Sequence, residues 1–432
     1  MIQLNPMKKF FEPLFLFLLL IMATNPVFAL EDVVKNNETK LQETEIILPQ
    51  DAKLPQHDVN KDGVINSEDV IVGETEENFF MSEILANPIK REEDSLFGKI
   101  QKTLKADVTR TDYANFLLKD LLTVDIEKGP VERLQFYGIY RGHALMNFQN
   151  SDLDSEYETS VLDVGVMGQM KPKYKSEFRL QLKFTPTSER SFIQNLFSDV
   201  YVVNKSIPNH QIIVGNSRNQ VGVEGGMSTV YLPFVMRSQI SRTFAGTRAL
   251  GVKVNGKYSL VDYTVAVNSS DRYFREFFPG TEFTGWVNFK PLGLTDGKYG
   301  KLVMGGGVNT GKNHHEYTVA GAYVGYNYKK FMINAEYSNA DGYNGKAYNP
   351  NKADGFYTTI GYKLTPKLQL VGRYDQFDPN RGIANDLRRE YSAGLNYFVI
   401  GQAMRILLNY VYCDNQNKED SHRIILGTQL LL

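Results

Sequence analysis

Apolar and polar residues alternate along most of this chain, from Gly129 to the C-terminus. In the clearest stretch, SEFRLQLKFTP, the apolar residues Phe178, Leu180 and Leu182 share one face and the polar residues between them share the other, because successive residues of a strand point to opposite sides. About sixteen stretches of this kind follow one another to Leu432. The pattern predicts β-strands that each present one apolar face.

The connections between these stretches also alternate, in length. Connections after even-numbered stretches are mostly short, such as NYKK and TPK, and those after odd-numbered stretches are mostly long and polar, such as NADGYNGKAYNPNKAD. Two depart from this rule, since the eighth connection (290–301) is long and the ninth (310–315) is short. Short turns at one end and long loops at the other are typical of outer-membrane barrels, and closure pairs every backbone group, as lipid demands. We therefore predict an all-β transmembrane fold, an antiparallel outer-membrane β-barrel of about sixteen strands over residues 129–432, surrounded by lipid.

Residues 1–29 have the features of a secretory signal peptide. Lys8 and Lys9 precede the apolar stretch 14–23, and Val27-Phe28-Ala29 offers a cleavage site. The apolar stretch is about half the roughly 20 residues that a membrane-spanning helix needs. The chain is therefore expected to be exported to the bacterial outer membrane, with the residues that precede the barrel in the periplasm.

Charge divides the exported chain into two parts. Residues 30–128 contain 12 Lys and Arg against 22 Asp and Glu, whereas residues 129–432 contain 34 against 26. Such asymmetry indicates different environments or partners. We divide the acidic part into a linker over 30–56, a metal-binding loop over 57–72 and a segment of short helices over 73–128, so that the barrel carries a small, partly helical periplasmic extension. The basic residues of the barrel part are spread through the strands, which indicates no nucleic-acid partner.

The loop at 57–72, HDVNKDGVINSEDVIV, places oxygen-bearing residues at alternate positions. Oxygens that converge in this way suit a hard cation, and Gly63 permits the sharp turn, so we expect a structural Ca²⁺. The predicted ligands are Asp58, Asn60, Asp62, Asn66, Asp69 and the backbone carbonyl of Val64. The string DVNKDGVINSEDV resembles one calcium repeat of the dockerin family, with Asp69 where an EF-hand has Glu. The sequence has no second repeat, which leaves open a cohesin-like or cell-wall partner, a lone calcium-stabilised turn, or a merely solvated acidic loop.

The fifth connection, over about residues 218–248, is the longest. Long segments without clear strands inside a compact fold usually serve a function. With the strand that follows, this one resembles the constriction-loop region of the phosphate-selective porin family, and the stretches VGRYDQFDPN and RILLNYVY match the same family. The residues that carry the resemblance in the connection are Phe234, Arg237-Ser238, Ala245-Gly246 and Arg248-Ala249-Leu250-Gly251-Val252. The resemblance covers residues 129–432 and implies a sixteen-stranded channel, a homotrimer, and this loop folded into the lumen.

Two sets of charged residues are candidates for lining the lumen. If the fifth connection folds inward, Arg237, Arg242 and Arg248 either form the constriction or fix the loop to acidic residues of the wall. The alternation of the strands predicts a lumen-facing set: Arg179, Lys183, Lys253, Arg373, Asp375, Arg405 and Arg423. A charged lumen selects solutes by width and by the sign of its charge, and the net positive charge of the barrel part favours anions.

Together these features predict a porin for the passive diffusion of small hydrophilic solutes, with a preference for phosphate-like or other small anions. The alternative is an outer-membrane structural tether or adhesin whose calcium-binding extension contacts another envelope component. A barrel hydrolase would need a nucleophile beside a histidine, and none of the histidines lies in a recognisable nucleophile motif. We therefore expect no enzymatic activity.

Overall fold

The computed structural model describes residues 123–149, 152–185, 196–245, 248–271, 278–295, 297–345 and 348–431. The expected signal peptide, the acidic linker, the calcium loop and the short-helix segment up to residue 122 lie outside the described residues.

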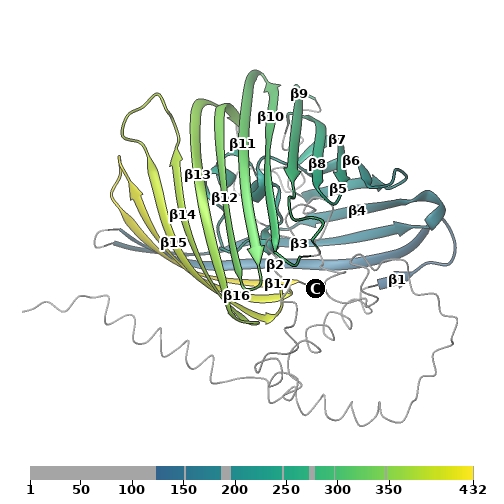
Figure 1. The fold of residues 1–432 in the computed structure, drawn as a ribbon, viewed down its shortest axis with the longest axis horizontal. Helices are drawn as coiled ribbons and strands as arrows, with labels where there is room; N and C mark the ends of the chain where they lie inside the picture. The colour runs from purple at the N-terminus through teal and green to yellow at the C-terminus, as the bar shows by residue number, and fades with distance from the viewer. Residues whose placement is uncertain are drawn as a thin grey trace, which may run out of the picture. The chain divides into compact units, whose positions relative to one another are not determined.

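Strands make up nearly all of the described chain, and they form one antiparallel sheet that closes into a barrel (Figure 1). Each strand from β2 to β17 pairs with the next in sequence, and β17 pairs with β2 to complete the circle. The first half comprises β1 Thr123–Asp125, β2 Val131–Gln149, β3 Asp152–Met170, β4 Ser176–Lys183, β5 Phe197–Asn204, β6 His210–Arg218, β7 Arg248–Lys257, β8 Val261–Ser269 and β9 Thr281–Phe289. The second half comprises β10 Lys301–Asn313, β11 His315–Tyr328, β12 Phe331–Asn344, β13 Tyr348–Thr365, β14 Leu368–Asp378, β15 Arg388–Ile400, β16 Met404–Asn415 and β17 Ser421–Leu431. Each of the sixteen alternating stretches corresponds to one strand from β2 to β17, which confirms the predicted fold.

The barrel has a turn end and a loop end. The turn end holds the connections after β3, β5, β7, β9, β11, β13 and β15, all short except 290–300, and includes the 3₁₀ helix η2 Pro172–Tyr174. The loop end holds the other connections, of which 219–247 is the longest. The long polar loops expected between β2 and β3 and over 339–354 between β12 and β13 are wrong, because the strands continue through most of each. The start of β3 is exposed on both faces, so the hairpin needs no apolar face there and is held by backbone pairing.

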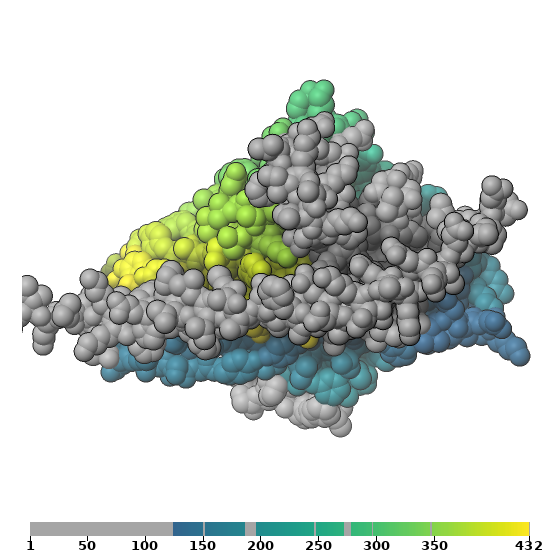
Figure 2. All heavy atoms as spheres, turned by 90° about the horizontal axis from the view of Figure 1, so that it is seen from below, coloured from purple at the N-terminus to yellow at the C-terminus, as the bar shows by residue number. Residues whose placement is uncertain are grey.

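The strands are apolar outside and polar inside. On β9, Phe283, Val287 and Phe289 are 41–52% exposed, whereas Glu282 and Thr284 on either side of Phe283 are fully buried. An outward apolar band of this kind matches a hydrocarbon surrounding. In the space-filling view the yellow C-terminal strands adjoin the blue N-terminal ones, as closure requires (Figure 2). No helix within the described residues is long and apolar enough to cross a membrane.

The short strand β1 joins the sheet ahead of the barrel. It pairs with residues 133–135 of β2, beside the part of β2 that β17 leaves uncovered. Arg133 Nε donates to Asp125 Oδ1 at 2.7 Å and the Ile126 amide to the Glu132 carbonyl oxygen at 2.7 Å. Residues 123–125, at the end of the segment 73–128, thus form a strand that covers an exposed edge of β2, and the rest of the expected short-helix segment lies outside the described residues.

Candidate functional site: a segment folded inside the barrel

Residues 219–245, between β6 and β7, form what we call the inner segment. It includes α7 Val223–Gly226, η3 Thr229–Tyr231 and α8 Gln239–Phe244. Its hydrogen bonds reach β2, β8, β9, β12, β14, β15, β16 and β17. A single segment can contact so many strands around a closed sheet only from the inside.

Two carboxylates of the barrel wall accept hydrogen bonds from backbone amides at the starts of the short helices. The carboxylate of Glu336 on β12 accepts from the amides of Val223 at 2.8 Å and Glu224 at 3.1 Å. Asp375 Oδ2 on β14 accepts from the Gln239 amide at 2.7 Å. The first amides of a helix have no partner within the helix and carry partial positive charge. The wall therefore supplies the acceptors that α7 and α8 lack.

Gly222 makes the approach to Glu336 geometrically feasible. Its φ is +72°, and a Cβ at this position would collide with the Glu336 carboxylate. Only glycine adopts that conformation at little cost. The sequence VGVEGG therefore allows the chain to turn tightly over Glu336.

Basic and amide side chains of the barrel wall donate hydrogen bonds to backbone carbonyl oxygens of the inner segment. Arg141 Nη1 on β2 donates to the Thr229 carbonyl oxygen at 2.5 Å, and Arg405 Nη2 on β16 donates to that of Leu232 at 2.9 Å. Further donors to segment carbonyl oxygens are Asn396 to Pro233, Arg373 to Met236 and Gln429 to Val230. Buried carbonyl groups cost free energy unless they are hydrogen-bonded, so these contacts stabilise a non-helical backbone inside the barrel.

A buried ion pair fixes the centre of the segment. Arg373 Nη1 lies 3.3 Å from Glu224 Oε1, and the two side chains are 2% and 4% exposed. The Arg373 guanidinium also lies over the Phe234 ring, 4.6 Å from its centroid. Glu224 Oε2 in turn accepts from the Ser238 amide at 2.8 Å. Each buried charge thus has an opposite charge beside it, as burial requires, although Arg373 Nε itself has no hydrogen-bond partner.

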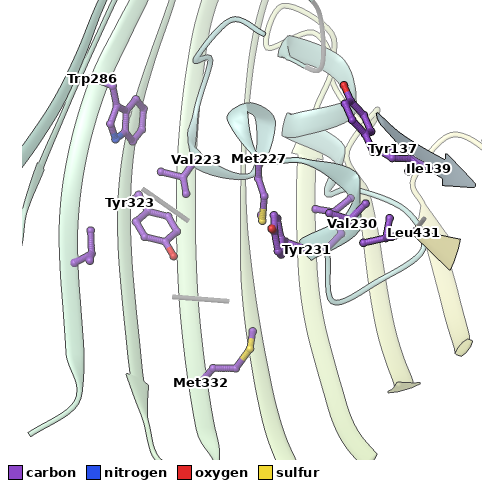
Figure 3. Packing of buried hydrophobic residues seen from close by; sticks show 12 residues of the cluster. Tyr137, Ile139, Val223, Met227, Val230, Tyr231, Trp286, Tyr323, Met332 and Leu431 are labelled. Carbon is purple, nitrogen blue, oxygen red and sulfur yellow. The ribbon is translucent and has the colours of Figure 1, made fainter. Parts of the chain in front are cut away.

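Apolar packing adds to these polar contacts. Met227, Tyr231 and other apolar residues of the inner segment pack against Trp286 on β9, Tyr323 on β11 and Met332 on β12 (Figure 3). A second cluster joins α8 to β11–β14. Fully burying one such side chain stabilises by roughly 1.5–3 kcal/mol. The inner segment is therefore a packed part of the barrel.

The three arginines predicted for the constriction are all engaged. Arg237 donates to the carbonyl oxygens of Glu224 and Met227 within its own segment. Burial lowers the pKa of Arg237 to about 10, so it stays cationic at neutral pH. Arg242 Nη2 donates to Glu390 Oε1 on β15 at 2.8 Å. Arg248 is the first residue of β7 and contacts the Asp199 carboxylate on β5.

The residues predicted to face the lumen fall into two groups. Arg373, Asp375 and Arg405 contact the inner segment directly, and Arg423 Nη1 lies 3.4 Å from the same Glu390 carboxylate that binds Arg242. The remaining three lie on β4 and β7. Arg179 Nε donates to Tyr137 OH at 2.6 Å, Lys183 faces Asp163 across the β3–β4 pair, and Lys253 Nζ donates to the Arg218 carbonyl oxygen at 3.2 Å.

The inner face of β3–β7, which we call the basic wall, has an excess of positive charge. Arg218 lies opposite Arg248 in the β6–β7 register. Around Asp163 and Asp199 the wall carries the cations Arg179, Lys183, Arg218, Arg248 and Lys253. Two further carboxylates lie towards its ends, Glu177 paired with Lys205 at 2.9 Å and Glu158 3.6 Å from the buried His143. Arg248, Arg179 and Arg218 all lie within electrostatic range of Asp199. One carboxylate thus serves three guanidinium groups.

Sequence reasoning missed several residues that hold the inner segment. Arg141, Asn396 and Gln429 occupy inward positions of alternating strands, so alternation could have found them. Glu224 lies in a segment without periodicity, and no sequence signal pairs it with Arg373. No group of three or more His, Cys, Asp or Glu side chains that could hold a metal ion occurs in the described part of the chain, and the predicted calcium ligands lie outside that part.

The arrangement defines a class: a sixteen-stranded barrel with a long segment packed inside it has the fold of an outer-membrane porin. Solved structures with this fold include OmpTdeltaL8, a loop L8 deletion mutant of OmpT from Vibrio cholerae, with a TM-score of 0.52 and 14% identity over 69% of this chain and 99% of that one. The anion-selective porin from Comamonas acidovorans gives a TM-score of 0.52 and 10% identity over 69% and 99% of the two chains. The outer-membrane channel DcaP of Acinetobacter baumannii gives 0.51 and 13% over 72% and 99%.

The sequence itself points to a particular family. Residues 295–430, which run from the β9–β10 connection to β17, match the family model "Phosphate-selective porin O and P". A comparison with curated protein sequences gives no significant match. The family match covers the C-terminal third of the chain, where the residues of β14–β17 hold the inner segment.

Proposed function

We propose that the protein is an outer-membrane porin that allows passive diffusion of small hydrophilic solutes. The observation that carries the proposal is the closed sixteen-stranded barrel with a segment packed inside it, since barrels of this size leave an aqueous channel. The family match over 295–430 supports the same assignment. In this proposal the inner segment and Arg248 beside it, the region 218–248, narrow the lumen from the side of β9–β17.

We further propose that the channel prefers small anions, phosphate-like ones among them. The part of the basic wall around Asp163 and Asp199 carries five cationic side chains against these two carboxylates, while Glu177 of the same wall is paired with Lys205. Many charges on the opposite wall are bound to the inner segment, so the basic wall supplies the unbalanced part of the field. Selectivity follows the sign of the charge at the narrowest point, and Arg248 belongs to that wall.

Planar-bilayer recording tests both statements. Purified protein should give discrete channel steps, and the reversal potential in a tenfold KCl gradient should have the sign of anion preference. Replacing residues 223–243 by a short Gly-Ser link should raise the single-channel conductance severalfold, provided that heat-modifiable migration on gels shows a folded barrel. Absence of channel steps in the wild type would rule out the porin, whereas a cation-selective reversal potential would rule out only the anion preference.

Three accompanying proposals concern assembly and the extension. The barrel assembles as a homotrimer, the extension lies in the periplasm, and residues 57–72 bind a structural Ca²⁺ through Asp58, Asn60, Asp62, Val64, Asn66 and Asp69. Alternating oxygen ligands around Gly63 support the calcium proposal. Analytical ultracentrifugation in detergent gives the number of subunits, and calorimetric titration of residues 30–122 with Ca²⁺ tests the metal site.

A further inference from the structure

The turn end of the barrel is rich in lysine. Its seven connections contain nine lysines and no arginine against one acidic residue, Asp296. The lysines are Lys171, Lys173, Lys175, Lys205, Lys290, Lys298, Lys329, Lys330 and Lys367. The loop-end connections other than 219–247 contain six basic and six acidic residues. Positive charge is therefore concentrated at one end of the barrel.

The described acidic residues at the turn end do not neutralise this charge. Glu177 pairs with Lys205 and Asp262 with Lys290, both at 2.9 Å. In and beside the seven turn-end connections, as far as the structure describes them, five exposed lysines have no carboxylate within 4.0 Å. They are Lys173, Lys175, Lys298, Lys330 and, at the start of β10, Lys301.

Exposed apolar residues lie among these lysines. Ile207, Tyr258, Leu294 and Tyr299 are 44–68% exposed in three neighbouring turn-end connections. The Lys298 ammonium lies over the Tyr299 ring at 5.3 Å from its centroid. The turn end thus presents a mixed basic and apolar surface, which suits a partner that is both acidic and apolar.

The chain's own extension has this composition and arrives at this end. Strand β1 pairs with the start of β2, so residue 122 is joined to the turn end. Residues 74–94 contain seven acidic residues against two basic ones, with the apolar run FFM at 79–81. The 95–122 stretch between them can extend to roughly 90 Å, more than the roughly 35 Å width of a sixteen-stranded barrel. Residues 74–94 can therefore reach every turn.

We propose that residues 74–94 dock on the turn end of the barrel, with their carboxylates on its unpaired lysines and their apolar residues on Ile207, Tyr258, Leu294 and Tyr299. The stretch nearest the barrel, 95–122, contains five basic and three acidic residues, so the charge match is specific to 74–94. The competing occupant is the anionic head groups of the surrounding lipid leaflet.

Trypsin cleavage after Lys90 and Arg91 reports the docking in the full exported chain, folded in non-ionic detergent without lipid. Docking shields this dibasic site, so the triple variant Lys173→Glu, Lys298→Glu, Lys330→Glu should be cut there at least fivefold faster than the wild type. In 1 M KCl the wild type should be cut as fast as the triple variant. The Debye length at that salt concentration is about 3 Å, so the attraction between carboxylates and lysines is screened. Heat-modifiable migration on gels checks that the wild-type barrel and the triple-variant barrel are both folded.

A matched triple variant at the loop end, Lys312→Glu, Lys352→Glu, Lys418→Glu, makes the same change in charge and should be cut at the wild-type rate. Equal rates in the wild type and the turn-end variant would overturn the proposal, as would protection that appears only in vesicles containing phosphatidylglycerol. Carbodiimide cross-linking supplies a second measurement. Links from Glu74, Glu76 or Glu77 to turn-end lysines support docking, and links confined to loop-end lysines contradict it.

Discussion

The inner face of β12–β17 and the basic wall of β3–β7 both carry charged side chains at alternating positions, but they use them differently. On β12–β17, Glu336, Arg373 and Asp375 are each bound to the inner segment and buried. On the basic wall, five cations lie around the two carboxylates of Asp163 and Asp199, and Glu177 is paired with Lys205. The number of charged residues along the strands therefore does not give the electrostatic field in the lumen. Charges on β12–β17 are paired with the inner segment, so they add little to that field.

The largest effect is expected from Arg373→Ala. The substitution leaves the Glu224 carboxylate buried without its cation, which should lower the free energy of unfolding by about 3–5 kcal/mol. Arg423→Ala is the control, since the Arg423 side chain is 29% exposed and its loss should cost at most about 1 kcal/mol. Urea unfolding followed by tryptophan fluorescence measures both. Equal losses would mean that the inner segment does not depend on its buried ion pair.

A smaller loss is expected from Gly222→Ala. Its φ of +72° disfavours alanine by about 1–2 kcal/mol, and the new Cβ would also press on Glu336. Gly297→Ala separates the two causes, because Gly297 has a φ of +73° with no atom within 4 Å of the added Cβ. Gly222→Ala should therefore destabilise more than Gly297→Ala in the same unfolding measurement. The reverse order would contradict the close contact with Glu336.

Charge reversal on the basic wall should change selectivity more than stability. Arg218→Glu places a carboxylate opposite Arg248 and should reduce the anion-to-cation permeability ratio on the order of fivefold, equivalent to about 1 kcal/mol. Arg423→Glu on the opposite wall should shift the ratio less. Reversal potentials in a KCl gradient measure both variants. A larger shift in the permeability ratio from Arg423→Glu would mean that the unbalanced positive charge lies on the β12–β17 wall and not on the basic wall.

Calcium removal should leave the comparison between the walls untouched. A chelator should speed proteolysis at Lys61, inside the proposed calcium loop, while the conductance and the unfolding of the barrel stay constant. Asp62→Asn should be cut at the fast rate with or without the chelator. A change in conductance on addition of the chelator would instead show that the extension influences the lumen.

The strands could be predicted from the sequence because a half-buried strand must alternate, and alternation also selected Arg373, Asp375 and Arg405, which contact the inner segment. Their partners could not be predicted, since the inner segment has no period and its contacts are mostly backbone groups. The β2–β3 hairpin was missed because its polar residues carry no apolar face. Strand β1 was missed because three residues are too few to show a pattern.

The inner segment has a consequence for how the barrel is completed. Arg141 on β2 and Gln429 on β17 both hold its carbonyl oxygens, and these two strands are the first and last of the circle. Joining chain ends that are so distant in sequence carries a large loop-closure entropy, which slows folding. A segment from the middle of the chain that binds both strands brings them together and lowers this entropic cost. The inner segment can thus act as an internal template for the final step of assembly, apart from any effect on the lumen.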